Sequence, residues 1–488
     1  MKRFISLVFI YAMSQQLSAQ KFDVALSELQ EETRMSENYA LPGGGFIGMK
    51  YIQDDRLITN WTKKKEKISI LLFDASMKLV KEFNMANGEK AFGITYTVFK
   101  KAGDKFWLIY EEPGDKSKLG DLKAVEINPV TLEPAAPKTI VAFGEIGFKP
   151  GMFGTFDLKI ESKASPNGKF RYFFIRKGKS DTHLCVTGAE FNVVWSKNDI
   201  TADIGKKDFN SMEINNQGTV FVGYMKDELG YVAVYRNAKA PQILDAGMEK
   251  GMAKEILVLT HKNNNSITIA GGYFENSSNV RGVFKADIDA SFKIGTILKV
   301  PFTESLVDLF DKDSWGSTKP QKFGIEPYYL AQLFEINDSI VDLVIEIKRE
   351  IDHQTMTVVH SGNILNVYFG NGSASFTRIP KYNVAHGSKW NHYYAMPFEK
   401  KMIIFYNDNT SNLKRDINAS PKLVNIEDNS VLVAAVIEPD GSVQRRLPLE
   451  LDQNYMGIAE WIKPVEAGRF QVPLYFKKKS GYATISIK

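Results

Sequence analysis

Histidine is the residue type whose clustering most suggests chemistry in this chain. Four of the six histidines fall between residues 353 and 392, namely His353, His360, His386 and His392. Imidazole groups that converge can bind zinc or act as general acid and base. No two of the four are spaced four residues apart, as they would be on one face of a helix, and none belongs to a tight chelating motif. The spacing therefore predicts no metal site, and no cofactor is expected.

The same part of the chain carries aromatic and basic residues in polar surroundings. Trp315 and Trp390 are of the kind that anchors a protein partner or stacks on a sugar ring, and the alternative is that they pack loops onto the core. Lys414 and Arg415, in the segment NLKRDINASPK, could contact an anionic group or remain solvated. Arg349 opens a further segment of this kind. We predict these residues and the four histidines as a binding surface.

The sequence carries no recognised motif for catalysis. It contains no GxSxG, HExxH or phosphate-binding loop, and its one cysteine has no evident catalytic partner. The segment DKDSWG offers Asp311, Asp313 and Gly316 as part of a calcium loop, but Trp315 and Lys322 stand where oxygen ligands are needed. A helical turn over 304–310 is the simpler interpretation. Catalytic residues remain unassigned.

A repeated pair of strands must position these residues. In residues 215–235, NNQGTVFVGYMKDELGYVAVY, a polar turn precedes an apolar strand, a charged turn and a second strand. Turns of Gly, Asn, Asp or Lys favour hairpins, and β-branched or aromatic runs favour strands. Eight such turns precede strand-like runs: QDDR (53–56), AGDK (102–105), SPNGK (165–169), NNQG (215–218), KNNNS (262–266), NDS (337–339), FEKK (398–401) and EAGR (466–469).

Each unit continues with a third strand and, in most units, a fourth. The pentapeptides DASMK (74–78) and DASFK (289–293) occupy the same place in two units. Four strands in each unit predict an all-β fold, a single β-propeller of eight blades, with seven as the alternative. The chain resembles the propeller superfamily in general, and its SPNGK turn is similar to the SPDGK-type turns of bacterial members. The last unit lacks a fourth strand, which residues 21–29 could supply and so close the ring.

Loop lengths in such a ring predict where a site would lie. The connections from the first to the second strand and from the third to the fourth share one face, and the other connections share the opposite face. The first set is short in this sequence. Four long segments, 304–324, 349–362, 381–392 and 408–429, belong to the opposite face in neighbouring units. Long loops on a rigid scaffold often carry function, so we predict the binding surface here.

The N-terminus has the pattern of a secretory signal peptide. Lys2 and Arg3 precede the apolar run FISLVFIYAM, and small residues follow before Gln20. The run is too short to span a bilayer. We expect cleavage after Ala19, leaving residues 20–488 as one propeller domain in the periplasm or outside the cell. Cys185 lies far from the leader, so no lipoprotein is expected, and its apolar neighbours predict a buried thiol.

Charge and composition limit the functional classes. The whole chain has 62 basic and 57 acidic residues and a formal net charge of +5, which does not favour a nucleic-acid partner. No stretch beyond the leader reaches transmembrane length. The sequence favours a non-catalytic scaffold that binds a protein or glycan of the cell envelope. The alternative is an exported hydrolase or lyase whose active site lies at the channel mouth on the long-loop face.

Overall fold

The computed structural model gives the arrangement of most of the chain. It describes residues 22–487 with these exceptions: 28–29, 32, 43, 53–66, 86–96, 113–119, 147, 149–157, 178–180, 205–208, 264–265, 275–278, 313–329, 338, 354–355, 371, 387–391, 423, 426–429, 450–454, 460–461, 467 and 477–478. The predicted leader, residues 1–19, lies outside the described residues. No helix among the described residues is long and apolar enough to cross a membrane.

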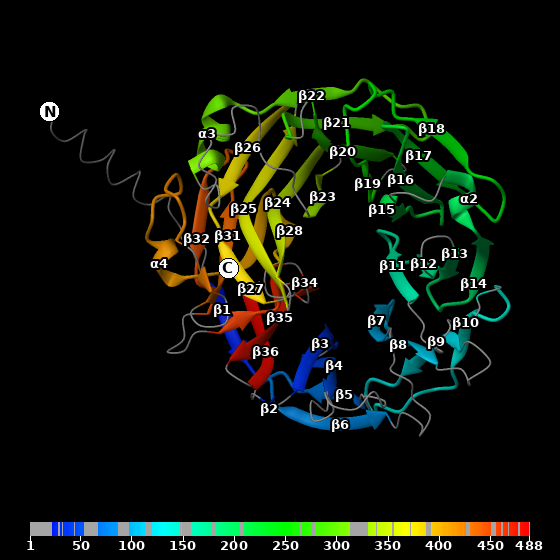
Figure 1. Cartoon of the computed structure of the whole chain (residues 1–488). Helices are drawn as coiled ribbons and strands as arrows, with labels where there is room; N and C mark the ends of the chain where they lie inside the picture. The colour runs from blue at the N-terminus through cyan, green and yellow to red at the C-terminus, as the bar shows by residue number, and fades with distance from the viewer. Residues whose placement is uncertain are drawn as a thin grey trace, which may run out of the picture.

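Eight sheets, each built around four antiparallel strands, form a ring in the described part of the chain (Figure 1). The first four blades consist of β3 (Thr33–Ala40), β4 (Phe46–Ile52), β5 (Lys67–Phe73) and β6 (Leu79–Met85); β7 (Thr97–Ala102), β8 (Lys105–Glu112), β9 (Asp121–Ile127) and β10 (Lys138–Ala142); β11 (Leu158–Ala164), β12 (Phe170–Lys177), β13 (Asp181–Gly188) and β14 (Val193–Asn198); and β15 (Phe209–Ile214), β16 (Val220–Lys226), β17 (Leu229–Tyr235) and β18 (Gln242–Asp245).

The other four blades complete the ring. They consist of β19 (Leu257–Thr260), β20 (Ile267–Tyr273), β21 (Gly282–Ile288) and β22 (Leu298–Pro301); β23 (Leu330–Asn337), β24 (Ile340–His353), β25 (Met356–Gly370) and β26 (Ser373–Ile379); β28 (Tyr394–Phe398), β29 (Lys401–Asp408), β31 (Val431–Ile437) and β32 (Val443–Arg446); and β33 (Met456–Gly457) with β34 (Lys463–Glu466), β35 (Arg469–Phe476), β36 (Lys479–Ile487) and β1 (Phe22–Leu26). The predicted eight-bladed propeller is confirmed.

Several further elements lie outside the four main strands of the blades. They are β2 (Gln30–Glu31), α2 (Ile200–Ile204), α3 (Glu304–Lys312), β27 (Asn383–His386), α4 (Thr410–Leu413) and β30 (Val424–Asn425). The helix α3 connects blades five and six, where the sequence predicted a helical turn.

The N-terminal strand closes the ring, as predicted. Strand β1 pairs antiparallel with β36, from Phe22 opposite Ile487 to Leu26 opposite Ala483. The Ser27 hydroxyl accepts a hydrogen bond from the backbone N–H of Tyr482 at 2.8 Å. The closure gives β36 a partner strand on its outer side and so covers the edge that it would otherwise present.

Apolar side chains fill the spaces between neighbouring blades. Trp107 of blade two packs in one cluster with Phe173 and Cys185 of blade three. Burial raises the pKa of the Cys185 thiol to about 12, so the thiol stays protonated and unreactive. The predicted buried cysteine is confirmed.

The two repeated pentapeptides form two turns of the same conformation. Asp74 Oδ1 accepts hydrogen bonds from the N–H groups of Ser76 and Lys78, at 2.9 and 3.0 Å. Asp289 Oδ1 accepts the equivalent pair at 2.9 Å each. The fourth residues, Met77 and Phe292, both have positive φ, 68° and 63°. An aspartate that hydrogen-bonds its own turn offsets the strain of such a conformation.

The prediction for the first blade was wrong in one respect. Its second strand is Phe46–Ile52, and the turn before it contains the LPGGG segment rather than QDDR. This turn requires glycine at position 45, because a Cβ there would lie 2.3 Å from the Phe73 carbonyl oxygen. The run RLITNW therefore falls between β4 and β5, outside the described residues. The other seven predicted turns each connect the first two strands of a blade.

Long connections lie on the expected face, although they are not confined to blades five to seven. The strand ends that flank residues 53–66, 86–96 and 143–157 in the first blades also lie at that face. Two connections on the opposite face are also long, 128–137 between β9 and β10 and 289–297 between β21 and β22. We call the two sides the long-loop face and the tight-turn face.

Candidate functional site

The hairpin of β24 and β25 is the largest departure from the simple blade. These strands pair from Val341 opposite Phe369 to His353 opposite Met356. Their neighbours β23 and β26 pair only as far as Glu346 and Ile364, so the hairpin continues past the blade on the long-loop face. There β27 pairs antiparallel with β25, and β30 pairs parallel with β27 (Figure 1). Blade six is thus extended into a sheet of six strands.

Four predicted site residues lie in this extension. The backbone of Arg349 is opposite His360, which is in turn opposite Val384. His386 is opposite Val358, two residue pairs further along, and His353 lies at the hairpin end. The backbone register therefore gathers these positions, which the sequence places up to 37 residues apart (386 − 349).

The other predicted site residues have separate positions. His392 is half-buried just before β28, Lys414 is exposed after α4, and Arg415 is half-buried beside it. The Arg415 carbonyl oxygen accepts a hydrogen bond from Arg445 Nη2 at 2.7 Å. Trp315 and Trp390 lie outside the described residues. No group of three or more His, Cys, Asp or Glu among the described residues could hold a metal ion.

A buried ion pair lies where the hairpin leaves the blade. The Lys381 ammonium contacts Glu346 Oε1, and both side chains are fully buried. The Lys381 backbone N–H also donates to Asn363 Oδ1 at 3.3 Å. Burial and the Glu346 charge raise the pKa of Tyr393, whose hydroxyl donates to the Val344 carbonyl oxygen at 3.0 Å. The connection after β26 is therefore fixed to the second strand of its own blade.

Buried asparagines connect the surroundings of this ion pair to blades seven and eight. Asn383 Nδ2 donates to the Asn407 carbonyl oxygen at 2.5 Å. The Asn407 side-chain amide donates to the Gly457 carbonyl oxygen at 2.8 Å and accepts from the Gly457 N–H at 3.0 Å. The Asn407 side chain thus makes the pair of bonds that a neighbouring strand backbone would make, and it links blade seven to blade eight.

The loop after β29 is anchored beside Asn407, by its neighbour Asp408. Asp408 Oδ1 accepts hydrogen bonds from Asn412 Nδ2 at 2.7 Å and from the Asn409 N–H at 2.8 Å. Asn412 also bonds both backbone groups of Lys422, at 2.9 and 3.0 Å. Burial raises the pKa of Asp408 to about 6, and the bond from Asn412 opposes that rise. One buried carboxylate thus organises the described part of this loop.

We call the set Glu346, Lys381, Asn383, Asn407, Asp408 and Asn412 the polar base. Sequence reasoning did not identify these residues as a group, although it placed the long loops that they support. One feature of the sequence does point to them, because Glu346 is an acidic residue within the mostly apolar run IVDLVIEI. Its partner is 35 residues away (381 − 346), and no local pattern connects them.

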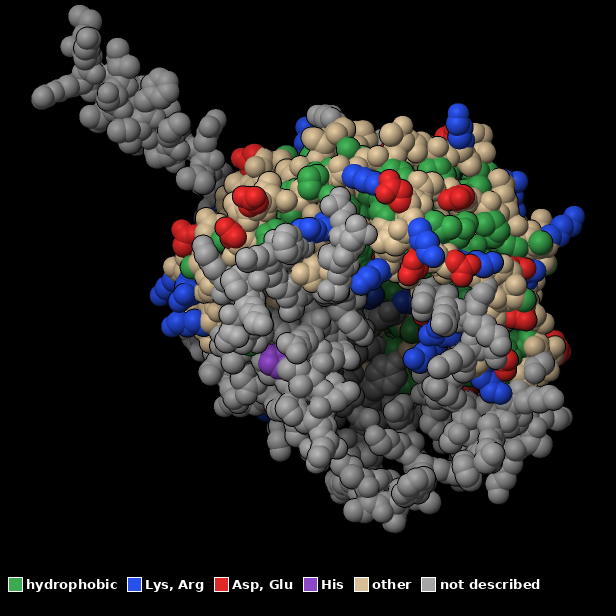
Figure 2. All heavy atoms as spheres, turned by 45° about the horizontal axis from the view of Figure 1, so that its top comes forward, with side chains coloured by type: hydrophobic (Ala, Val, Ile, Leu, Met, Phe, Trp, Pro, Cys, Tyr) green, Lys and Arg blue, Asp and Glu red, His purple; other side chains and the backbone are tan. Residues whose placement is uncertain are grey.

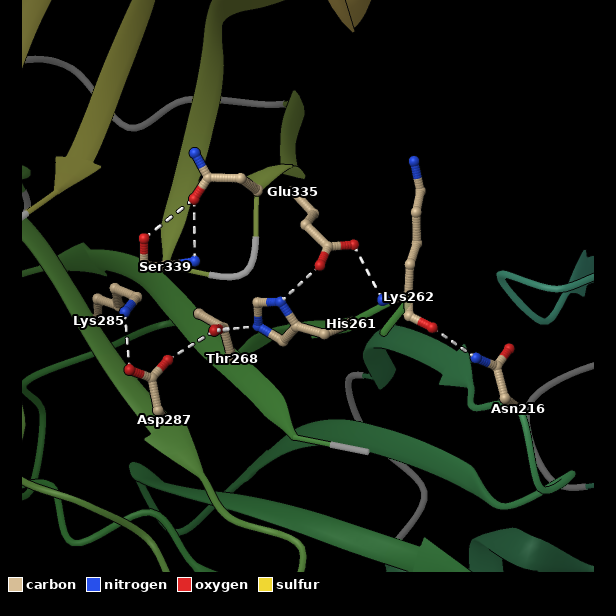
Figure 3. Close-up of polar contacts among 9 residues, drawn as sticks. Asn216, His261, Lys262, Thr268, Lys285, Asp287, Glu335 and Ser339 are labelled. Carbon is tan, nitrogen blue, oxygen red and sulfur yellow. Dashed lines mark hydrogen bonds and ion pairs between the residues drawn. The ribbon is translucent and has the colours of Figure 1, made fainter. Parts of the chain in front are cut away.

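A second polar chain links turns on the opposite, tight-turn face (Figure 3). Asn216 Nδ2 donates to the Lys262 carbonyl oxygen at 2.8 Å, and the Lys262 N–H donates to Glu335 Oε2 at 3.0 Å. Asn216 Oδ1 accepts from the Asn167 N–H at 2.9 Å. The first turns of blades three to six are thereby connected one to the next.

His261 lies at the centre of that chain. Its Nδ1 is 3.1 Å from Glu335 Oε1 and its Nε2 is 2.9 Å from the Thr268 hydroxyl (Figure 3). The Thr268 hydroxyl also contacts Asp287 Oδ1 at 2.6 Å. Burial opposes ionisation of Asp287, but hydrogen bonds from Lys285 and Thr268 outweigh it and lower its pKa. The hydroxyl is fully buried, so this acid, imidazole and hydroxyl series fastens blade five to blade six and offers no nucleophile to a substrate.

Charges of both signs are mixed over the visible face of the molecule in Figure 2. The described acidic and basic side chains there alternate without a broad area of one sign. A surface of this kind attracts partners through specific contacts more than through long-range steering.

Comparison with known proteins identifies no family for this chain. No protein-family model matches the chain, and no curated protein matches it. Among solved structures, the chain is similar to the WD40 domain of SCAP from fission yeast, with 8% identity over 96% of this chain and 98% of that one and a TM-score of 0.41. It is similar to the β-propeller domain of the Trilobed protease from Pyrococcus furiosus, with 10% identity, coverage of 88% and 96%, and a TM-score of 0.37. A NanB sialidase variant from Streptococcus pneumoniae matches with 8% identity, coverage of 97% and 95%, and a TM-score of 0.33.

Proposed function

We propose that this chain is an exported β-propeller that acts as a non-catalytic binding scaffold for a protein or glycan of the cell envelope. The partner binds the long-loop face of blades six and seven. Residues 20–488 are the mature domain, released after Ala19, as the leader pattern of the first 19 residues favours. One observation carries the proposal: the longest hairpin and the loop after β29 are built on the buried polar base.

A braced loop is suited to recognition. Binding costs free energy for every side chain and loop that must be ordered, roughly 0.5–1.5 kcal/mol for each flexible side chain. A loop already fixed by Asp408 and Asn412 avoids much of that cost. Lys414 and Lys422 are exposed on this loop and are available to a partner. The histidine and arginine positions of the extension lie on the same face.

Site-specific photo-crosslinking tests the face. A photoreactive residue is placed at Lys414 or at Lys422 on the long-loop face, and at exposed Lys169 on the tight-turn face as the matched control. The full-length protein is expressed, irradiated in intact cells and analysed for protein and glycan adducts. We expect adducts from the first two positions and not from the third. Equal adducts from all three positions, or adducts from Lys169 alone, would contradict the proposal.

A further inference from the structure

A recess opens between blades six and seven on the tight-turn face, away from the proposed binding surface. Its volume is about 240 Å³ with its open mouth included, and its enclosed part has room for one body the size of a water molecule. Blade six contributes strands β24, β25 and β26, and blade seven contributes turn residues such as Lys400 and Gly441. The Thr377 hydroxyl bridges the blades here by donating to the Gly441 carbonyl oxygen at 3.4 Å.

Strand register explains which side chains meet in the recess. Alternate residues of β24 share one face, and Val344 packs with Met402 and Ile404 of blade seven. Asp342 therefore also faces blade seven, and Asn366 lies opposite Val344 in the next strand. An aspartate inside an otherwise apolar strand is costly to bury unless something compensates its charge.

Two buried oxygen atoms in the recess have no hydrogen-bond partner among the described residues. Asp342 and Asn366 are each 2% exposed. Asn366 Nδ2 donates to Asp342 Oδ2 at 3.1 Å, which fixes the orientation of the amide. Asp342 Oδ1 and Asn366 Oδ1 both remain unsatisfied. Asn366 Oδ1 is an acceptor at any pH, and Asp342 Oδ1 is an acceptor when the carboxyl is ionised, so in that state both atoms call for a donor or a positive charge.

The charges around the recess leave one negative charge without a partner. Glu438 at its edge pairs with Lys401 at 3.0 Å. Lys400 at the rim is exposed. Burial raises the pKa of Asp342 to about 7, and burial together with the Asp342 charge raises the pKa of Tyr368, which also lines the recess. Above that pH the Asp342 carboxylate is ionised while buried, which is unfavourable without a cation.

We propose that this recess binds one monovalent inorganic cation of the sodium or potassium class, held by Asp342 Oδ1 and Asn366 Oδ1. The Ser375 and Thr377 hydroxyl oxygens line the same space and complete a set of hard oxygen ligands. One carboxylate with neutral oxygens matches a single positive charge. The bound ion joins strands of blade six to the turns of blade seven.

Thermal unfolding of the purified protein at pH 8 tests the ion. We compare potassium or sodium chloride with tetramethylammonium chloride at the same ionic strength, because the larger cation cannot enter the recess. A ligand that binds only the folded state stabilises it, so we expect Tm to be higher by about 2–4 °C in the small cation. At pH 5.5 Asp342 is protonated, and the difference should shrink. Equal Tm values in both salts at pH 8 would overturn the proposal.

Three variants separate the ion from other causes. Asp342→Asn should abolish the difference between salts and, in tetramethylammonium at pH 8, should be more stable than the unsubstituted protein. Asp440→Asn removes an exposed charge from the nearby turn but can still accept the Ser442 N–H, so it should keep the full difference. Lys400→Gln should keep it as well. If Tm differs between the salts only in the Lys400→Gln variant, then the Lys400 ammonium itself neutralises Asp342 in the unsubstituted protein. That result would also overturn the proposal.

Anomalous scattering gives a direct test. Crystals of the full chain grown in rubidium chloride should show one anomalous peak adjacent to both Asp342 and Asn366. The peak should be absent from crystals of Asp342→Asn. A well-ordered recess without rubidium would contradict the proposal.

Discussion

At the scale of single residues, Lys381 and Glu346 show how charge is managed inside this fold. Both side chains are fully buried and contact one another. Transfer of each ion from water costs several kcal/mol, and mutual attraction offsets that cost only while both are present. The pair therefore contributes little net stability, but removal of either member leaves a buried charge without a partner and destabilises the protein.

Lys381→Met is expected to destabilise the protein by about 3–5 kcal/mol, because it leaves the Glu346 carboxylate buried and uncompensated. The double variant Glu346→Leu with Lys381→Met should recover most of that loss, as measured by denaturant-induced unfolding. Lys401→Met is the control, since its pair with Glu438 is partly exposed and should matter by about 1 kcal/mol or less. A double variant no more stable than the single one would contradict this account.

At the scale of elements, the loop after β29 is held by side chains in place of regular secondary structure. The helix α4 has only one turn, capped by the Asn409 side chain. Asn412 then joins Asp408 to the backbone of Lys422, at the two ends of the described loop. Arg378 and Arg445 also donate to the Ile417 and Arg415 carbonyl oxygens in the middle of the loop, at 2.7 Å each. Because Asn412 holds its two ends together, the loop should loosen when that amide is lost.

Asn412→Ala should therefore expose the loop to protease. We expect faster tryptic cleavage after Lys414 and Arg415 and a loss of about 1–3 kcal/mol of stability, because Asp408 loses a buried hydrogen-bond donor. Limited proteolysis followed by mass spectrometry measures the cleavage. Asn418→Ala lies in the same loop and leaves the bond of its own backbone N–H to Asp416 intact, so it should behave like the unsubstituted protein. Equal cleavage of the two variants would argue against the anchor.

At the scale of the whole molecule, stability depends on a contact between the two ends of the chain. Phe22, Val24 and Leu26 of β1 pack against the apolar cluster shared by blades seven and eight. Without β1, strand β36 would present an unpaired edge, and such edges promote association with other chains.

A variant that begins after Leu26 should have a lower Tm than a chain that begins at Gln20 and should form oligomers, as measured by light scattering. A synthetic peptide of residues 21–29 should restore both properties by supplying the missing strand. The same peptide with Val24→Lys should fail, because residue 24 is a half-buried contact to the cluster. Rescue by both peptides would show that the effect is not strand pairing.

Sequence reasoning succeeded where the determinants are local. Asp74 and Asp289 act within their own turns, so matching pentapeptides predicted matching structure. The first blade was misplaced because RLITNW has strand-like composition, whereas the choice of Phe46–Ile52 depends on pairing with β5. The polar base and the Asp342 recess were missed for the same reason. Their partners come from different strands and blades, and only the folded ring brings them together.

The pairing of β1 with β36 also determines which face of the molecule points outward when the protein is attached to a support. Phe22 lies opposite Ile487, and the Ile487 N–H donates to the Gly468 carbonyl oxygen in the first turn of blade eight at 2.7 Å. The start of β1 and the end of β36 therefore both lie on the tight-turn face. A tether attached at either end, on a sensor chip or a bead, would orient the long-loop face outward, toward whatever is passed over it.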